Sequence, residues 1–179
     1  MDEKKVAIFC AASTKVPDKY NEAAREVVRA LHALNYTILS GGGAVGTMGA
    51  ITDESVRLGG LHTAVLPRFM KGLENPAVKD VVWTETMAER KERMREGTCA
   101  AIALPGGTGT LEEIAEVMSK VALGHLDAPC ILYNLGGYYD GLKSLLGRMI
   151  EAGLSSPQKQ AGIRFADSLA EIQRIVEGA

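Results

Sequence analysis

Short apolar runs alternate with longer amphipathic segments along the whole chain. The short runs are rich in Val, Ile, Leu and Ala, which predicts buried strands. The longer segments repeat apolar residues every three or four positions, as at Val27, Val28, Leu31 and Leu34, which predicts helices with one buried face. The predicted strands are residues 6–10, 36–39, 61–66, 78–83, 99–104, 130–133 and 163–165. The predicted helices are residues 20–34, 46–58, 85–96, 111–123, 138–152 and 168–176, and residues 67–76 are predicted as a loop.

Strands and helices that alternate with short links favour an α/β fold, because each helix carries the chain back to start a parallel strand. The run CAAIAL at residues 99–104 has no polar position, as expected for a parallel strand covered on both faces. The sequence therefore predicts a three-layer α/β/α fold with a mostly parallel central sheet. Its 179 residues contain no internal repeat, linker or low-complexity stretch, so we expect a single domain over residues 1–179.

The composition argues against several classes of partner. The net charge is −2 and no basic run occurs, which gives no electrostatic basis for binding a nucleic acid polymer. Residues 1–5 are polar and no long apolar segment follows, so we expect neither a signal peptide nor a membrane span. The three cysteines form no CxxC motif and lie in or beside apolar runs, which favours buried thiols in a reducing compartment: Cys10, Cys99 and Cys130. We therefore expect a cytoplasmic protein with a small-molecule partner.

A glycine-rich turn follows the second predicted strand. Gly41, Gly43 and Gly46 match the pattern G-x-G-x-x-G between a strand and a helix, where the backbone can approach a phosphate closely. The dinucleotide-binding version of this motif is disfavoured, because the next strand ends at Leu66, Pro67 and Arg68 without an acidic residue for a ribose hydroxyl. A nucleotide or phosphate loop and a purely structural tight turn both remain open for this segment.

A second glycine-rich turn, PGGTGTLEE at residues 105–113, follows the fifth predicted strand. Its glycines and threonines leave several backbone N–H groups exposed at a helix start, an arrangement that holds an anion. Thr110 and Glu113 have the spacing of a capping box, which would explain Glu113 structurally. Capping does not account for the preceding glycines, whereas a catalytic carboxylate beside a bound phosphosugar would explain both. Ligands of open parallel sheets bind beyond the carboxyl ends of the strands, where both turns are expected.

The predicted helix at residues 85–96 carries charges on its apolar side. Arg90 and Lys91 lie three and four residues after Met87, within the stripe that Met87 shares with Met94. Charges on such a stripe are unusual unless they are paired or face a cleft. The alternative is that both side chains extend past the edge of the stripe into solvent.

Two other features of this helix have structural explanations. Thr86 and Glu89 have the spacing of a capping box at the helix start. Arg93 and Arg95 point away from the methionine stripe, so we expect both to be solvated.

Together these residues resemble the Lonely Guy (LOG) family, once widely described as possible lysine decarboxylases. The family pattern is a GGG…GxMG segment, an Arg-Lys pair before a methionine, and PGGxGTxxE. Residues 40–49, Arg90-Lys91 with Met94, and residues 105–113 match these three parts, and the resemblance extends over nearly the whole chain. It implies a Rossmann-like fold, usually as a homodimer. It also implies release of a free cytokinin base and ribose 5-phosphate from cytokinin nucleotides, with some members acting on AMP.

The resemblance also implies roles for individual residues. Arg90 and Glu113 match the catalytic positions. The positions expected to bind the substrate are Ser40, Gly42, Gly43, Gly46, Met48, Lys91, Gly106, Gly107, Thr108, Gly109, Thr110 and Glu112. This chain departs from the family at Phe69 and Met70, where family members often carry an acidic residue after Pro-Arg. The departure leaves open whether the natural base carries a cytokinin side chain or is plain adenine.

A mechanism without metal or cofactor follows as a hypothesis. Cleavage of a ribosyl C1′–N bond builds positive charge on the sugar, so we assign Glu113 to stabilise an oxocarbenium-like transition state and to orient water. Arg90 is too weak an acid to donate a proton, so we assign it an electrostatic role. Residues 106–110 would bind the 5′-phosphate. The histidines are isolated and lack metal-ligand spacing, so structural or solvated positions are expected for His32, His62 and His125.

Three other functions compete with this hypothesis. Pyridoxal-dependent decarboxylation needs a Schiff-base lysine with partners for the cofactor, and no such constellation is present. An NAD-binding module is disfavoured by the missing acidic residue. A non-catalytic nucleotide or molybdenum-cofactor carrier of similar fold would keep the glycine-rich turns without needing Arg90 and Glu113 together.

Overall fold

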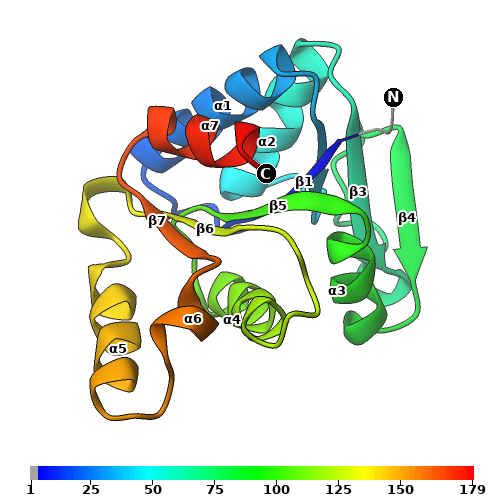
Figure 1. The fold of residues 1–179 in the computed structure, drawn as a ribbon. Coiled ribbons are helices and arrows are strands. Elements are labelled where there is room, and N and C mark those ends of the chain that lie inside the picture. Colours follow the sequence, from blue (N-terminus) through cyan, green and yellow to red (C-terminus); the bar gives the residue numbers. More distant parts are fainter. Residues whose placement is uncertain (1–3) are drawn as a thin grey trace.

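The structure, a computed structural model, describes residues 4–179. The predicted polar N-terminus lies partly outside the described residues, since residues 1–3 are not among them. The described strands form one seven-stranded sheet in the order β4-β3-β2-β1-β5-β6-β7, and every neighbouring pair is parallel (Figure 1). The strands are β1 (Lys5–Phe9), β2 (Thr37–Ser40), β3 (His62–Pro67), β4 (Asp80–Thr84), β5 (Thr98–Ala103), β6 (Cys130–Tyr133) and β7 (Ile163–Ala166). The predicted parallel sheet is confirmed.

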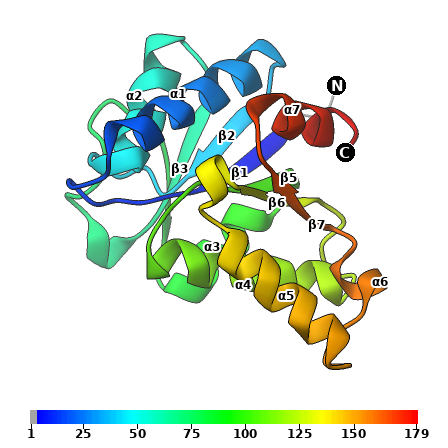
Figure 2. The ribbon, with the colours of Figure 1, turned by 90° about the vertical axis from the view of Figure 1, so that its left-hand side faces the viewer.

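Helices cover both faces of the sheet, which confirms the three-layer prediction (Figures 1 and 2). One layer contains α1 (Asp18–Ala33), α2 (Gly46–Arg57) and α7 (Leu169–Glu177). The other contains α3 (Met87–Arg95), α4 (Thr108–Ala122), α5 (Asp140–Glu151) and α6 (Pro157–Gln160). Two short 3-10 helices, η1 (Arg68–Met70) and η2 (Leu135–Gly137), and α6 were not predicted. They are too short to produce a helical repeat of apolar residues.

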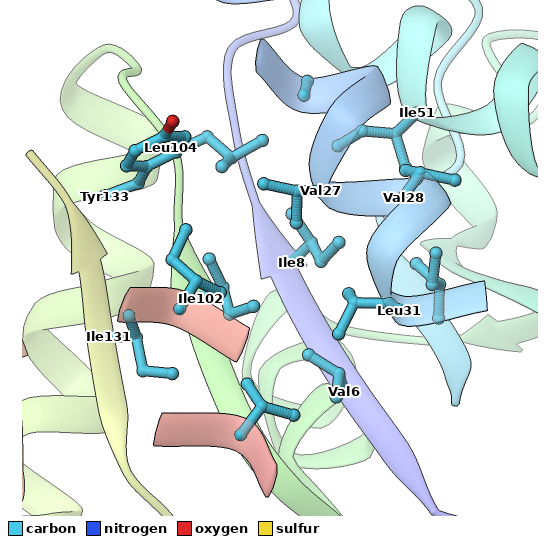
Figure 3. Packing of buried hydrophobic residues seen from close by; sticks show 14 of the residues in the cluster. Val6, Ile8, Val27, Val28, Leu31, Ile51, Ile102, Leu104, Ile131 and Tyr133 are labelled. Carbon is cyan, nitrogen blue, oxygen red and sulfur yellow. The ribbon is translucent and has the colours of Figure 1, made fainter. Parts of the chain in front are cut away.

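The core has two halves because β1 turns successive side chains to opposite faces of the sheet. Val6 and Ile8 pack under α1, α2 and α7 with the apolar residues of those helices (Figure 3). Ala7 and Phe9 pack on the other face with residues of α3, α4 and α5. All four side chains are almost completely buried, as expected for a central parallel strand.

The strand order reverses between β1 and β5. From β1 the chain builds outward through β2 and β3 to the edge strand β4, and α3 then returns it to the centre, where β5 pairs with β1. The second half builds outward to β7 at the other edge. Open α/β sheets bind ligands beyond the carboxyl ends of the strands at such a reversal. The two glycine-rich turns follow β2 and β5 at this end of the sheet.

The cysteine prediction holds for two residues out of three. Cys10 and Cys130 are buried, whereas Cys99 is partly exposed and its thiol donates to the carbonyl oxygen of Lys5 at 3.2 Å. Burial raises the pKa of Cys130 to about 12, and burial is also the main cause of the raised pKa of Cys10. Both thiols therefore stay protonated, and a reactive-cysteine role finds no support in them. Within residues 4–179, no helix is both long and apolar enough to cross a lipid bilayer.

Candidate active site

Arg90 and Glu113 form an ion pair between α3 and α4, from Nη1 to Oε1. The two side chains are only 8% and 11% exposed. The Nε of Arg90 also donates to the carbonyl oxygen of Val65 in β3 at 3.0 Å. Buried charges are tolerated when they are paired and hydrogen-bonded, and Arg90 is both. The charge on the apolar stripe of α3 is thus explained by pairing, and the alternative of a solvated arginine is wrong for this residue.

The guanidinium of Arg90 also lies against the first glycine-rich turn. A Cβ added to Gly41 would lie 2.7 Å from Nη2 of Arg90 and 2.9 Å from the side chain of Met48. These distances are shorter than any real Cβ contact, so a side chain at position 41 would displace the guanidinium. Arg90 therefore contacts the backbone of the first turn and the carboxylate of Glu113 just after the second turn. Its side chain therefore lies between the two glycine-rich turns.

The second turn leads directly into α4, which begins at Thr108 with Gly107 as its N-cap. Among the described residues no side chain caps this helix, so its first amide groups have no partner from within the helix. The predicted capping box of Thr110 and Glu113 is wrong, because Thr110 already lies inside the first turn. Glu113 lies in the second turn of the helix and pairs with Arg90 instead. Capping therefore does not explain this carboxylate.

Conformation explains two glycines of the first turn. Gly42 and Gly46 have φ angles of +63° and +64°, a region that favours glycine. A Cβ on Gly42 would lie 2.2 Å from the Cβ of Ala64, and one on Gly46 would lie 2.5 Å from the carbonyl oxygen of Ser13. Both positions require glycine for the turn itself, whatever the ligand. Their contact with a substrate stays a prediction.

Ser40 and Met48 also help to hold the first turn. Ser40 is completely buried; its Oγ accepts from the backbone N–H of Gly42 at 3.0 Å and lies 2.8 Å from Nε2 of His62. The backbone N–H of Met48 donates to the carbonyl oxygen of Ala11 at 3.0 Å, while its side chain lies against Gly41 and would meet a Cβ on Gly43 at 3.1 Å. Substrate contacts of Ser40, Gly43 and Met48 stay predictions.

Lys91 is engaged by two carboxylates of α4. Its Nζ pairs with Glu112, and it lies 2.8 Å from Oε2 of Glu116. These hydrogen bonds, chiefly that with Glu112, raise the pKa of Lys91. Arg95 continues the series, with Nη1 at 2.8 Å from Oε1 of Glu116. Four ion pairs thus join α3 to α4, including that of Arg90 with Glu113.

The prediction that Arg95 is solvated is wrong, since its side chain is only 13% exposed. The same prediction for Arg93 is confirmed, since it is 51% exposed and pairs with the neighbouring Glu96. The difference arises because the partner of Arg95 is on another helix, and the pattern of a single helix carries no information about such a contact.

The loop after β3 covers the first turn. The backbone N–H of Asn75 donates to the carbonyl oxygen of Gly42 at 2.8 Å, and that of Ala44 donates to the carbonyl oxygen of Leu73 at 3.3 Å. Phe69, where the resemblance implied an acid, lies in η1 and is highly exposed. This position lies just after β3, the strand whose Val65 accepts a hydrogen bond from Arg90.

Tyr138 and Tyr139, which were not predicted as site residues, reach the second turn from the connection that follows β6. The hydroxyl of Tyr138 donates to the carbonyl oxygen of Gly106 at 2.5 Å. The hydroxyl of Tyr139 donates to that of Leu104 at 2.7 Å. The available signal was the position of the two tyrosines just after a strand, next to two glycines.

An open depression of about 1010 Å³ lies at the opposite end of the sheet. Its lining includes Pro129 and Gly162, which come just before β6 and β7, together with Arg164 and Arg174. It contains neither Arg90 nor Glu113, and the buried ion pair identifies the candidate site better than the volume of this depression does. Within residues 4–179, His, Cys, Asp and Glu do not gather in groups of three or more that could hold a metal ion.

Comparison with known proteins supplies the family. Residues 48–176 match the family model described as possible lysine decarboxylase. A cytokinin riboside 5'-monophosphate phosphoribohydrolase of Arabidopsis thaliana is 36% identical over 177 residues, which cover 97% of this chain and 83% of the relative. The chain belongs to the LOG family. A cytokinin riboside 5'-monophosphate phosphoribohydrolase of Mycobacterium tuberculosis is 32% identical over 171 residues, covering 94% of this chain and 91% of that protein.

Solved structures share the fold of this LOG protein at low identity. The molybdenum cofactor binding protein of Rippkaea orientalis has a TM-score of 0.74 at 20% identity, covering 99% of this chain and 98% of its own. The molybdenum cofactor carrier protein of Chlamydomonas reinhardtii has a TM-score of 0.75 at 18% identity, with the same coverage. At these identities the likeness shows the fold alone.

Proposed function

We propose that this LOG protein hydrolyses the N-glycosidic bond of a purine nucleoside 5′-monophosphate, either cytokinin-type or AMP, to free base and ribose 5-phosphate. The observation that carries the proposal is the buried pair of Arg90 and Glu113, joined to both glycine-rich turns at the carboxyl end of the sheet. The LOG relatives in Arabidopsis thaliana and Mycobacterium tuberculosis carry the name of this activity. A carrier protein of the same fold would need the turns but not a buried catalytic pair.

The chemistry assigns separate work to the two residues. As the C1′–N bond breaks, its electron pair leaves with the base nitrogen, which takes up a proton, and positive charge develops on C1′ and the ring oxygen. The carboxylate of Glu113 stabilises that charge and orients a water molecule, whose oxygen bonds to C1′ and which then loses a proton. Arg90 keeps its proton, and its guanidinium holds Glu113 in position and contacts the nucleotide. Such stabilisation is strong because the pair is shielded from water.

The 5′-phosphate is assigned to the second turn. The free amide groups of Gly107, Thr108, Gly109 and Thr110 lie at the positive end of the α4 dipole, which favours an anion. Lys91 adds a positive charge one residue from Arg90. In this structure its ammonium group is paired with the carboxylates of Glu112 and Glu116. We assign binding of the base and the ribose to the first turn and Phe69.

The Glu113→Gln variant tests this function. It keeps the shape of the side chain and its contact with Arg90 but removes the negative charge. We expect release of adenine from AMP, and of free base from isopentenyl-AMP, to fall at least a hundredfold, with AMP binding retained. The exposed Glu92→Gln of α3 is the matched control. Unchanged turnover in Glu113→Gln would remove this residue from the mechanism, and absence of base release in the wild type would favour the carrier function.

We propose further that the chain acts as a homodimer through α5. This helix is amphipathic, yet none of its residues is buried within the described chain. On its apolar side, Leu142 and Leu146 pack against the core, whereas Leu145 is 41% exposed and Met149 and Ile150 are partly exposed. Faces of this kind on a monomer mark association sites. Sedimentation should show a dimer, and Leu145→Glu should convert it to a monomer; a monomeric wild type would overturn this proposal and leave the hydrolase proposal intact.

The cytoplasm is the compartment we propose for this activity. Three free cysteines among the described residues support it, because disulfides are rare in a reducing environment. Cell fractionation with an activity assay tests the assignment.

A further inference from the structure

Two consecutive tyrosines hold the backbone of the second glycine-rich turn from outside. The hydroxyl of Tyr138 donates to the carbonyl oxygen of Gly106, 32 residues earlier, and that of Tyr139 donates to the carbonyl oxygen of Leu104, 35 residues earlier. The two accepting carbonyl groups flank Pro105. Both tyrosines come from the connection between β6 and α5, so a separate part of the fold fixes the direction of this turn.

The direction of the Gly106 carbonyl group determines the direction of one amide donor. In a planar trans peptide, the C=O of one residue and the N–H of the next point in opposite directions. Holding the oxygen of Gly106 toward Tyr138 therefore directs the N–H of Gly107 away from Tyr138. Gly107 is the N-cap of α4, so this N–H joins the free amide groups of the first helical turn.

A peptide between two glycines needs such a constraint. Glycine populates positive and negative φ almost equally, so the unit between Gly106 and Gly107 can rotate at little cost. A rotated peptide would present a carbonyl oxygen where an amide donor stood, and that oxygen would repel a phosphate. We propose that Tyr138 is a positioning residue, which prevents this rotation and keeps the Gly107 amide available to the nucleotide phosphate; the inference rests on the proposed function.

The surroundings hold Tyr138 itself in place. Its ring makes edge contacts with the rings of Tyr20 at 5.9 Å and Tyr139 at 5.0 Å between centroids. The ammonium group of Lys19 lies 4.9 Å from the ring centre of Tyr20. The backbone N–H of Tyr139 donates to Oδ1 of Asn134 at 2.6 Å, which fixes the chain between the two phenols. Burial, the main cause, raises the pKa of Tyr139, so its hydroxyl remains a donor.

A merely structural role predicts a different outcome. Tyr138 is 44% exposed, so its ring contributes less to the core than a buried tyrosine. Removing only its hydroxyl should change the free energy of unfolding little. Tyr36 offers a matched control, because its hydroxyl also donates to a backbone carbonyl, that of Val176 at 3.2 Å, but in the opposite helix layer.

The experiment compares Tyr138→Phe with Tyr36→Phe and the wild type. Calorimetry measures binding of ribose 5-phosphate, which carries the phosphate but has no bond to cleave, and adenine release from AMP gives kcat and KM. We expect Tyr138→Phe to weaken ribose 5-phosphate binding about tenfold and to raise KM for AMP similarly, with kcat changed less than twofold. Tyr36→Phe should bind ribose 5-phosphate like the wild type, even though it loses more stability.

Two results would overturn the inference: equal ribose 5-phosphate affinity in Tyr138→Phe and the wild type, or a fall in kcat with affinity unchanged. A wild type that binds ribose 5-phosphate but releases no base would refute the proposed hydrolysis only. In that case the affinity difference between the two variants still decides the role of Tyr138.

Discussion

Arg90 and Glu113 meet as a buried ion pair although they are 23 residues apart and lie on different helices. Arg90 belongs to the helix that ends the first half of the sheet, and Glu113 to the helix that opens the second half. Each carries a charge that would be costly in this position without the other. The pair therefore links stability and the proposed chemistry in one contact.

Replacing Arg90 should damage both properties. In Arg90→Gln the carboxylate of Glu113 loses its partner, and the carbonyl oxygen of Val65 loses its donor. We expect a loss of about 3 kcal/mol in the free energy of unfolding and a fall of at least a hundredfold in kcat/KM. Urea titration and an adenine-release assay measure the two effects. The control is Arg93→Gln on the same helix, and equal effects in both variants would contradict this account.

The contact between Arg95 and Glu116 should contribute to stability without contributing to the chemistry. We expect Arg95→Gln to lower the free energy of unfolding by about 1 kcal/mol, because the pair is partly buried and bridges two helices. The exposed Arg93 should give less than about 0.5 kcal/mol when changed to Gln. A double change of Arg95 and Glu116 would measure their coupling. A coupling energy of zero would show that the contact between Arg95 and Glu116 does not contribute to the free energy of unfolding.

Two glycines with nearly the same φ should respond differently to alanine. Gly42→Ala combines a φ of +63° with a Cβ placed 2.2 Å from that of Ala64, whereas a Cβ on Gly59, with φ +65°, would meet no described atom within 4 Å. We expect Gly59→Ala to cost about 1 kcal/mol and Gly42→Ala to cost about 3 kcal/mol or more. Thermal unfolding of both variants measures the two losses, and their difference gives the cost of the close contact with Ala64 apart from the cost of the positive φ. Equal shifts would show that the backbone at Gly42 relaxes freely.

Acid should destabilise the fold through His62. Burial lowers the pKa of His62 to about 4, against the opposing effect of the Asp80 charge. The unfolded chain therefore binds the proton more readily, with a pKa near 6.5. This contribution to stability is complete above pH 6.5 and is lost as the pH falls toward 4, by about 3 kcal/mol in total. His62→Gln should flatten the curve of stability against pH in this range; a curve as steep as that of the wild type would contradict the role assigned to His62.

Some parts of the fold could be predicted from local patterns, and others depended on distant contacts. The apolar run at residues 99–104 became β5 because a central strand excludes polar residues from both faces. The start of α4 was placed three residues late, because the capping-box spacing of Thr110 and Glu113 is a more specific signal than a glycine at the N-cap. Arg95 was wrongly predicted to be solvated, and Tyr138 was not predicted as a site residue. In both cases the partner comes from another element of the fold. The charge of Arg90 conflicted with its own helix pattern, which left pairing and exposure open, and the contact with Glu113 on another helix decided between them.

Because α3 returns the chain to the centre of the sheet, it also restricts the positions at which residues can be inserted or deleted. This helix joins the edge strand β4 to the central strand β5 and carries Arg90 on the way. One inserted residue before Arg90 within the helix would turn its side chain by about 100° around the helix axis, away from Glu113. An insertion beside the highly exposed Leu154, between α5 and α6, would rotate neither partner. Homologous chains are therefore expected to differ in length at the α5–α6 connection, whereas the segment from β4 to β5 keeps a constant number of residues.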